Sequence, residues 1–212
     1  MNRLLASAAA LTLLTSAPAA AQKSPERIQL TDRSSDGAIL IRVPVKPYEY
    51  TLQFSKDGSS GFLSRVYLMK VRSGPEGYRY IARTLSPGRY RLDSVWQQGS
   101  WSACLENGTI EVPVSAGRIA YLGTLGVDQV LQGIQNDAVI RGRTALGMGD
   151  FTVARPEDAR PLVEGRDEAA VAEARTFAQD VMNGSGARLD VAPVSEVAFN
   201  TSAAGRAIKV CG

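Results

Sequence analysis

The stretch TLSPGRYRLDSVW, residues 84–96, and the later stretch VSAGRIAYLG, residues 114–123, have the same arrangement. Each places small turn residues, Pro87 and Gly88 in the first and Gly117 in the second, before a run that alternates large and polar side chains. Proline fixes φ for the second position of a turn and glycine can adopt the positive φ of the third, which favours a type II turn at SPGR. Both stretches therefore predict hairpin joints of a β-sheet.

Similar runs fill the chain between residues 38 and 127. They are short, rich in β-branched and aromatic residues, and separated by turn clusters such as KDGSSG and ENG. Their period is two, so that Tyr50, Leu52 and Phe54 share one face of their run. The spacing of about 8 to 14 residues from run to run predicts a mainly β fold, an antiparallel β-sandwich of seven to eight strands.

The N-terminal residues MNRLLASAAALTLLTSAPAAAQ combine a single cation, Arg3, with a short apolar stretch and a small-residue exit. This pattern predicts a Sec-type signal peptide over residues 1–21, cleaved near Ala21 and Gln22, and therefore a periplasmic or secreted protein. The Ala-rich signal indicates a bacterial source. No later stretch approaches about 18 apolar residues, so we expect no transmembrane segment.

The residue composition and the periodicity divide the remaining chain into three parts. We expect a flexible leader over residues 22–37, the β-sandwich core over 38–127, and a β/α extension over 128–212 that packs on the same domain. Residues 128–149 are rich in glycine and ambiguous, with strands expected at 138–143 and at 150–155. One amphipathic helix is expected after Asp167, because apolar residues then recur at spacings of three and four. These residues are Val171, Ala174, Ala178 and Val181, with Phe177 and Met182 widening the stripe.

The charges indicate no nucleic-acid partner. The chain has 24 basic and 21 acidic residues, and removal of Arg3 with the signal leaves 23 against 21. The basic and acidic residues are interspersed along the sequence, and the chain lacks the run of basic residues with which nucleic-acid-binding proteins contact a phosphate backbone. The two cysteines, Cys104 and Cys211, both follow the signal, and an oxidising compartment favours a disulfide between them. That disulfide would close a loop of roughly 107 residues and stabilise the fold by about 4 to 5 kcal/mol.

The chemistry open to the chain is restricted by the absence of histidine from the sequence. Serine or cysteine catalysis with a histidine base and histidine-ligated metal sites are removed, and two distant cysteines cannot form a four-cysteine site. We therefore expect no metal, no cofactor and no enzymatic activity. A hydrolase that uses carboxylates alone stays open, with Asp93 and Glu106 as its candidate pair.

Two tryptophans give the clearest sign of a binding site. Trp96 and Trp101 flank the loop QQGS, which contains Gln98. Flat aromatic faces beside an amide suit a sugar or peptide groove. The simpler explanation, which we favour from the sequence, is that one tryptophan fills the core of the sandwich and the other caps it near a disulfide. Strict alternation from Tyr90 would place Trp96 on the same face as Leu92.

The segments LSPGRYRLDSV and TIEVPVSAGRIAYLGTL, with Cys104 between them, carry a resemblance. In this region the chain resembles exported bacterial β-sandwich proteins of unknown function and is similar in texture to transthyretin-like and carboxypeptidase-regulatory-like domains. The resemblance implies a sandwich fold, an extracytoplasmic location and no reaction. The sequence thus predicts a non-enzymatic, envelope-associated interaction module whose partner is an envelope protein or a cell-wall component. A carbohydrate- or peptide-binding sandwich and the carboxylate hydrolase are its alternatives.

Overall fold

The computed structural model describes residues 28–44, 46–57, 66–72, 79–97, 101–105, 108–140, 152–154, 161–182 and 186–197. The fold is mainly β, with two sheets and two helices in this part of the chain. The five-stranded sheet comprises β1 (Gly37–Arg42), β4 (Tyr80–Leu85), β8 (Arg118–Gly126), β10 (Leu162–Glu164) and β11 (Arg188–Val191). The seven-stranded sheet comprises β2 (Tyr50–Lys56), β3 (Val66–Val71), β5 (Gly88–Gln97), β6 (Trp101–Cys104), β7 (Thr109–Val114), β9 (Thr152–Ala154) and β12 (Ser195–Val197). The helices are α1 (Asp128–Ile140) and α2 (Glu168–Val181).

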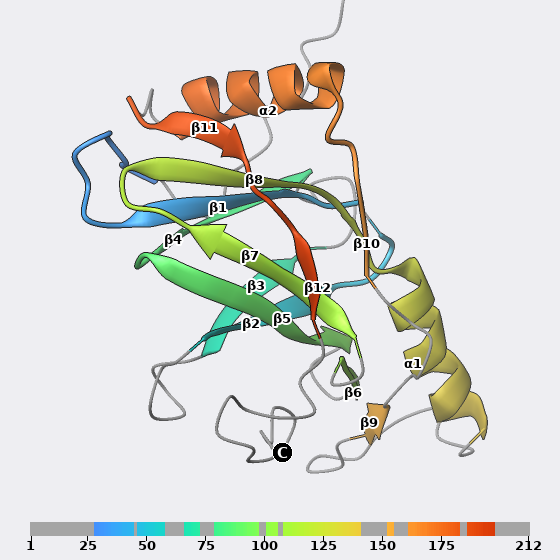
Figure 1. Cartoon of the computed structure of the whole chain (residues 1–212). Helices are drawn as coiled ribbons and strands as arrows, with labels where there is room; N and C mark the ends of the chain where they lie inside the picture. Colours follow the sequence, from blue (N-terminus) through green and yellow to red (C-terminus); the bar gives the residue numbers. More distant parts are fainter. Residues whose placement is uncertain are drawn as a thin grey trace, which may run out of the picture.

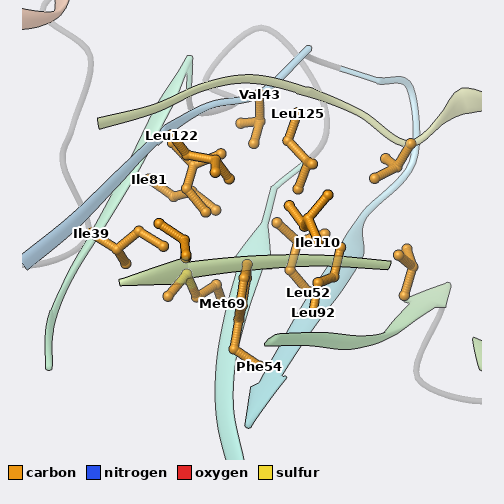
Figure 2. Close-up of a cluster of buried hydrophobic side chains, with 14 of the residues drawn as sticks. Ile39, Val43, Leu52, Phe54, Met69, Ile81, Leu92, Ile110, Leu122 and Leu125 are labelled. Carbon is orange, nitrogen blue, oxygen red and sulfur yellow. The ribbon is translucent and has the colours of Figure 1, made fainter. Parts of the chain in front are cut away.

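The two sheets face each other across one hydrophobic core. Figure 2 shows Ile39, Ile81 and Leu122 of the five-stranded sheet beside Leu52 and Leu92 of the seven-stranded sheet. Every one of these side chains is almost fully buried, as the alternation of the sequence predicts for the inward face. The positions between them point away from the core, and these outward faces are where the two sheets differ.

The turns SPG (residues 86–88) and SAG (residues 115–117) are not hairpin joints. β4 lies in the five-stranded sheet and β5 in the seven-stranded sheet, so SPG carries the chain from one sheet to the other, and SAG returns it between β7 and β8. Gly88 is the first residue of β5 with φ of 156°, far from the about +80° of a type II turn. Gly117 has φ of 63°, and a Cβ there would lie 2.3 Å from the backbone oxygen of Asp32. Turn residues report a change of direction, but they do not specify which sheet the next strand joins.

The expectation of purely antiparallel pairing is also wrong. β1 pairs antiparallel with β4 but parallel with β8, and β11 pairs parallel with β8. A parallel pair needs a long connection, and between β1 and β8 the strands β2 to β7 supply it, all of them except β4 in the other sheet. The neighbours β2, β3, β5, β6 and β7 of the seven-stranded sheet do pair antiparallel, as predicted.

Helix α2 covers the outward face of the five-stranded sheet (Figure 1). Its start at Asp167 is confirmed: the Asp167 carboxylate accepts a hydrogen bond from the Ala170 amide, which lowers the pKa of that carboxyl group. Val171, Ala174, Ala178 and Met182 of the predicted stripe are buried against β1 and β8. Phe177 stacks on Tyr80 of β4 with ring centroids 4.5 Å apart.

Helix α1 was not predicted, and residues 138–140 of the expected strand 138–143 are helical. Val130, Leu131 and Ile134 of this helix pack into the core, so tertiary burial favours the helix despite Gly133. Part of the predicted leader is packed as well, since Ile28 and Leu30 are buried on the five-stranded sheet under α2. Of the expected strand at 150–155, residues 152–154 form β9, and the chain beyond α2 adds β11 to one sheet and β12 to the other (Figure 1).

Candidate functional site

The outward face of the seven-stranded sheet is shaped by a β-bulge at Asp93. Gln53 of β2 is paired with Ser94 of β5, whereas the next residue, Phe54, is paired with Leu92. Asp93 is therefore the extra residue of the bulge, and the alternation reverses beyond it. Trp96 consequently lies on the outward face and not with Leu92, which corrects the prediction from strict alternation.

Trp96 is held in place by two hydrogen bonds. Its indole Nε1 donates to the Ser94 hydroxyl at 2.9 Å and to the side-chain oxygen of Gln53 at 3.2 Å. The side chain is partly exposed, and Thr51 of β2 is its cross-strand partner. Because hydrogen bonds hold the indole nitrogen in place, the partly exposed ring is a preformed flat surface on which a ligand can stack.

Around Trp96 the outward face stays accessible to solvent. Gln53 and Thr51 are partly buried, Leu68 of β3 is 52% exposed, and Lys70 of β3 forms an ion pair with Glu49 at 2.7 Å. The register places Leu68 opposite Gln53 and Lys70 opposite Thr51, so these side chains lie in two adjacent rows across β5, β2 and β3. We call this set the open patch: Thr51, Gln53, Leu68, Lys70 and Trp96.

The other half of the outward face is buried. We call it the covered patch, and it consists of five polar residues that are each at most 3% exposed: Asp93, Ser94, Ser102, Thr109 and Glu111. They come from β5, β6 and β7. Buried polar groups require partners, and the Thr109 hydroxyl donates to the Leu92 carbonyl at 2.5 Å.

Asp93 is the most perturbed carboxyl group of this face. Burial raises its pKa from 3.8 to about 7, against the opposing effects of the Ser55 hydrogen bond and the Arg91 charge. The Ser55 hydroxyl donates to Asp93 Oδ1 at 2.7 Å. Near neutral pH the group is therefore shared between its protonated and ionised forms.

Glu111 lies beside two arginines. Arg91 Nε donates to Glu111 Oε2 at 2.8 Å, and Arg89 Nε donates to Glu111 Oε1 at 2.5 Å. Arg91 also forms an ion pair with Asp57 at 2.7 Å. The positive charge of the same guanidinium lowers the pKa of Asp93, against the larger effect of burial. Glu111 is 4% exposed in its side chain, which gives a substrate almost no access to this carboxylate.

The structure describes only some of the residues that were predicted for the site. Trp96 lies on the open patch, whereas Gln98 and Glu106 lie outside the described residues. Trp101 is in β6 and pairs with Gln97, while Trp96 pairs with Ser102, so the two tryptophans are not cross-strand partners. The side chain of Trp101 is outside the described part of the structure, as are the signal peptide and Cys211. Cys104 is buried in β6, and its disulfide with Cys211 stays a prediction.

No protein-family model, curated protein or solved structure matches the chain. The resemblance to transthyretin-like domains therefore stays a prediction from the sequence. In the described ranges, no group of three or more Cys, Asp or Glu side chains is placed to hold a metal ion. Neither α1 nor α2 is long and apolar enough to cross a membrane.

Sequence reasoning missed Thr51, Gln53, Leu68 and Lys70 because they reach Trp96 only through the strand register. Gln53 and Trp96 are 43 residues apart in the chain. The available signal was alternation in YTLQFS, which places Thr51 and Gln53 on the face opposite Leu52.

Proposed function

We propose that the protein is a non-enzymatic, exported β-sandwich module of the cell envelope that binds carbohydrate through the open patch. The observation that carries this proposal is the fixed, partly exposed Trp96 ring beside the Gln53 amide on a sheet face. Sugar rings present apolar C–H faces that stack on flat aromatic rings, and their hydroxyls pair with amide and hydroxyl groups.

The neighbours of Trp96 supply these polar groups. Gln53 uses its side-chain oxygen for the indole, and the amide nitrogen of the same group carries two further donors. Thr51 and Lys70, which carry a hydroxyl and an ammonium group, lie in the same cross-strand row as Trp96. A neutral sugar with an occasional acidic substituent therefore matches the patch better than a strongly charged ligand.

The burial of Asp93 argues against the carboxylate hydrolase. Of the candidate pair, Asp93 is 2% exposed, so a glycosidic bond could not reach its carboxyl group without movement of the chain. Glu106, the other candidate, lies outside the described residues. In this proposal the acids take no part in chemistry.

Tryptophan fluorescence tests the proposal. A Trp101→Phe variant leaves Trp96 as the one emitting tryptophan, and Trp96→Phe is the matched control. Soluble muropeptides, chito-oligosaccharides and the sugar-free stem peptides are the probes. We expect saturable quenching by a sugar-containing probe in Trp101→Phe, and an affinity at least about tenfold weaker in Trp96→Phe when binding is followed by calorimetry. Binding of the stem peptides alone would reject the carbohydrate in favour of a peptide ligand, and no response to any probe would reject the open patch.

A further inference from the structure

The edge strands on one side of the sandwich concentrate positive charge. In the described part of the chain, β3 pairs only with β2 and β4 pairs only with β1, so each strand is an edge of its sheet. Residues 66–72 and 79–85, which contain these two strands, include no acidic residue. They include four cations, namely Lys70, Arg72, Arg79 and Arg83. Arg79 lies 3.3 Å from Glu173 of α2, whereas the other three lie on or beside β3, as the next contacts show.

Arg83 carries its charge from the five-stranded sheet to the seven-stranded sheet. Its side chain is on the same face of β4 as Ile81, which faces the core. From this edge position the guanidinium reaches β3, where Nη1 donates to the Leu68 carbonyl at 2.9 Å. Leu68 is opposite Gln53, so Arg83 extends their cross-strand row beyond β3. The guanidinium group therefore adjoins the open patch.

Lys70 and Arg72 add two more positive charges beside the same patch. Thr51 pairs with both Trp96 and Lys70, so Lys70 lies two strand spacings, or about 9.6 Å, from Trp96. Arg72 directly follows β3 and is exposed, and alternation places it on the side of Lys70, about 7 Å further along the chain. Glu49, which pairs with Lys70 at 2.7 Å, is 44% exposed, so a ligand can compete with it.

We propose that these three cations, which we call the basic edge, bind an acidic substituent of the sugar chain that stacks on Trp96. The inference rests on the proposed carbohydrate binding and names the class of carbohydrate. One sugar ring lies on Trp96, and a carboxylate elsewhere on the same oligosaccharide reaches Lys70, Arg72 and Arg83. Guanidinium groups match the geometry of a carboxylate, and complementary charge favours a ligand that carries one over an uncharged ligand of the same shape.

Paired probes that differ only in charge test the proposal. One pair is the disaccharide of N-acetylglucosamine and N-acetylmuramic acid with its methyl ester, and the other is tetragalacturonate with its methyl ester. Calorimetry of the full chain at low ionic strength gives both dissociation constants, and the ratio of ester to acid is the readout. For at least one pair, we expect the acid to bind about fivefold to tenfold more tightly than the ester.

Variants of the basic edge should remove this discrimination. We expect the ratio to fall towards one in Arg83→Gln and in the double variant Lys70→Gln with Arg72→Gln, which changes only exposed side chains. Arg188→Gln is the matched control. It removes one charge from a side chain that is 75% exposed on β11, and it should keep the ratio of the wild type.

Glu49→Gln gives a test of the opposite sign. Removal of this acid leaves Lys70 without a competing partner, so the ratio should rise by about twofold to threefold. An ion pair with only a structural role would not raise it.

Equal affinity of the wild type for acid and ester, in both pairs, would overturn the basic edge. If Trp96→Phe still weakened both probes, the carbohydrate proposal would stand. Discrimination that survives in Arg83→Gln and in the double variant would place the carboxylate elsewhere and also overturn the inference. Binding to phosphatidylglycerol vesicles without discrimination between the probes would reassign the basic edge to a membrane surface. No binding of any probe would reject both proposals.

Discussion

The indole nitrogen of Trp96 donates to the side-chain oxygen of Gln53 at 3.2 Å, which joins the outward faces of β5 and β2. Replacement of Gln53 by alanine removes this acceptor and leaves the Ser94 hydroxyl at 2.9 Å. We expect a loss of about 0.5 to 1.5 kcal/mol in the free energy of unfolding and a shift in Trp96 emission. Thr51→Ala is the control, since it keeps both hydrogen bonds of the indole. Equal emission spectra for the two variants would contradict this role of Gln53.

The raised pKa of Asp93 predicts how stability depends on pH. Asp93 keeps its proton up to about pH 7 in the folded state, whereas it releases the proton near pH 3.8 in the unfolded chain. Ionisation between these pH values therefore stabilises the unfolded state relative to the folded state. The contribution of Asp93 to the free energy of unfolding should therefore be largest below about pH 4 and fall by at most about 4 kcal/mol as the pH rises to about 7. Above about pH 7 this contribution should level off.

Urea unfolding of the wild type and of Asp93→Asn across this pH range measures the effect. Asp93→Asn keeps an uncharged group of the same shape, so it should remove most of the slope between about pH 4 and about pH 7. Asp190→Asn, at a carboxyl group 41% exposed, should keep the slope. A slope that survives in Asp93→Asn would assign the pH dependence to another group.

The two arginines beside Glu111 differ in exposure and should differ in their effect on stability. Arg89 is 63% exposed and Arg91 is 18% exposed. We expect Arg89→Ala to cost less than about 1 kcal/mol, as is usual for solvent-screened pairs. Arg91→Ala should cost about 3 kcal/mol or more, because Arg91 is the more buried of the two partners of Glu111 and its loss leaves Oε2 of this buried carboxylate unpaired. Chemical denaturation of the two variants compares them directly, and equal losses would contradict the different burial of the two ion pairs.

The inter-sheet corner at Gly117 should not tolerate a side chain. Gly117→Ala places a Cβ against the Asp32 carbonyl at a residue with φ of 63°, so we expect a loss of about 2 kcal/mol or more. At Gly186 a Cβ meets nothing within 4 Å, and Gly186→Ala should change stability by less than about 0.5 kcal/mol. Thermal unfolding of both variants decides the point, and a neutral Gly117→Ala would show that the corner is not tight.

The sequence carried enough information for the strands and for α2, but not for the way in which the strands assemble. Alternation in YTLQFS and the stripe from Val171 to Met182 depend on local periodicity, which a single chain displays. The parallel pairing of β1 with β8 depends on contacts between residues about 80 apart, for which the turn residues give no information. For the site, Trp96 was identified by residue type, whereas the bulge at Asp93 that turns it outward becomes visible only in the register with β2.

The most direct test of the account is a map of chemical-shift changes in the ¹⁵N-labelled protein during titration with the sugar probe that binds best. The account predicts shifts at the indole N–H of Trp96 and at the amides of Thr51, Gln53, Leu68 and Lys70, with none at the α2 residues over the five-stranded sheet. Shifts centred on α2, or on β8 and β11, would contradict the assignment of binding to the open patch.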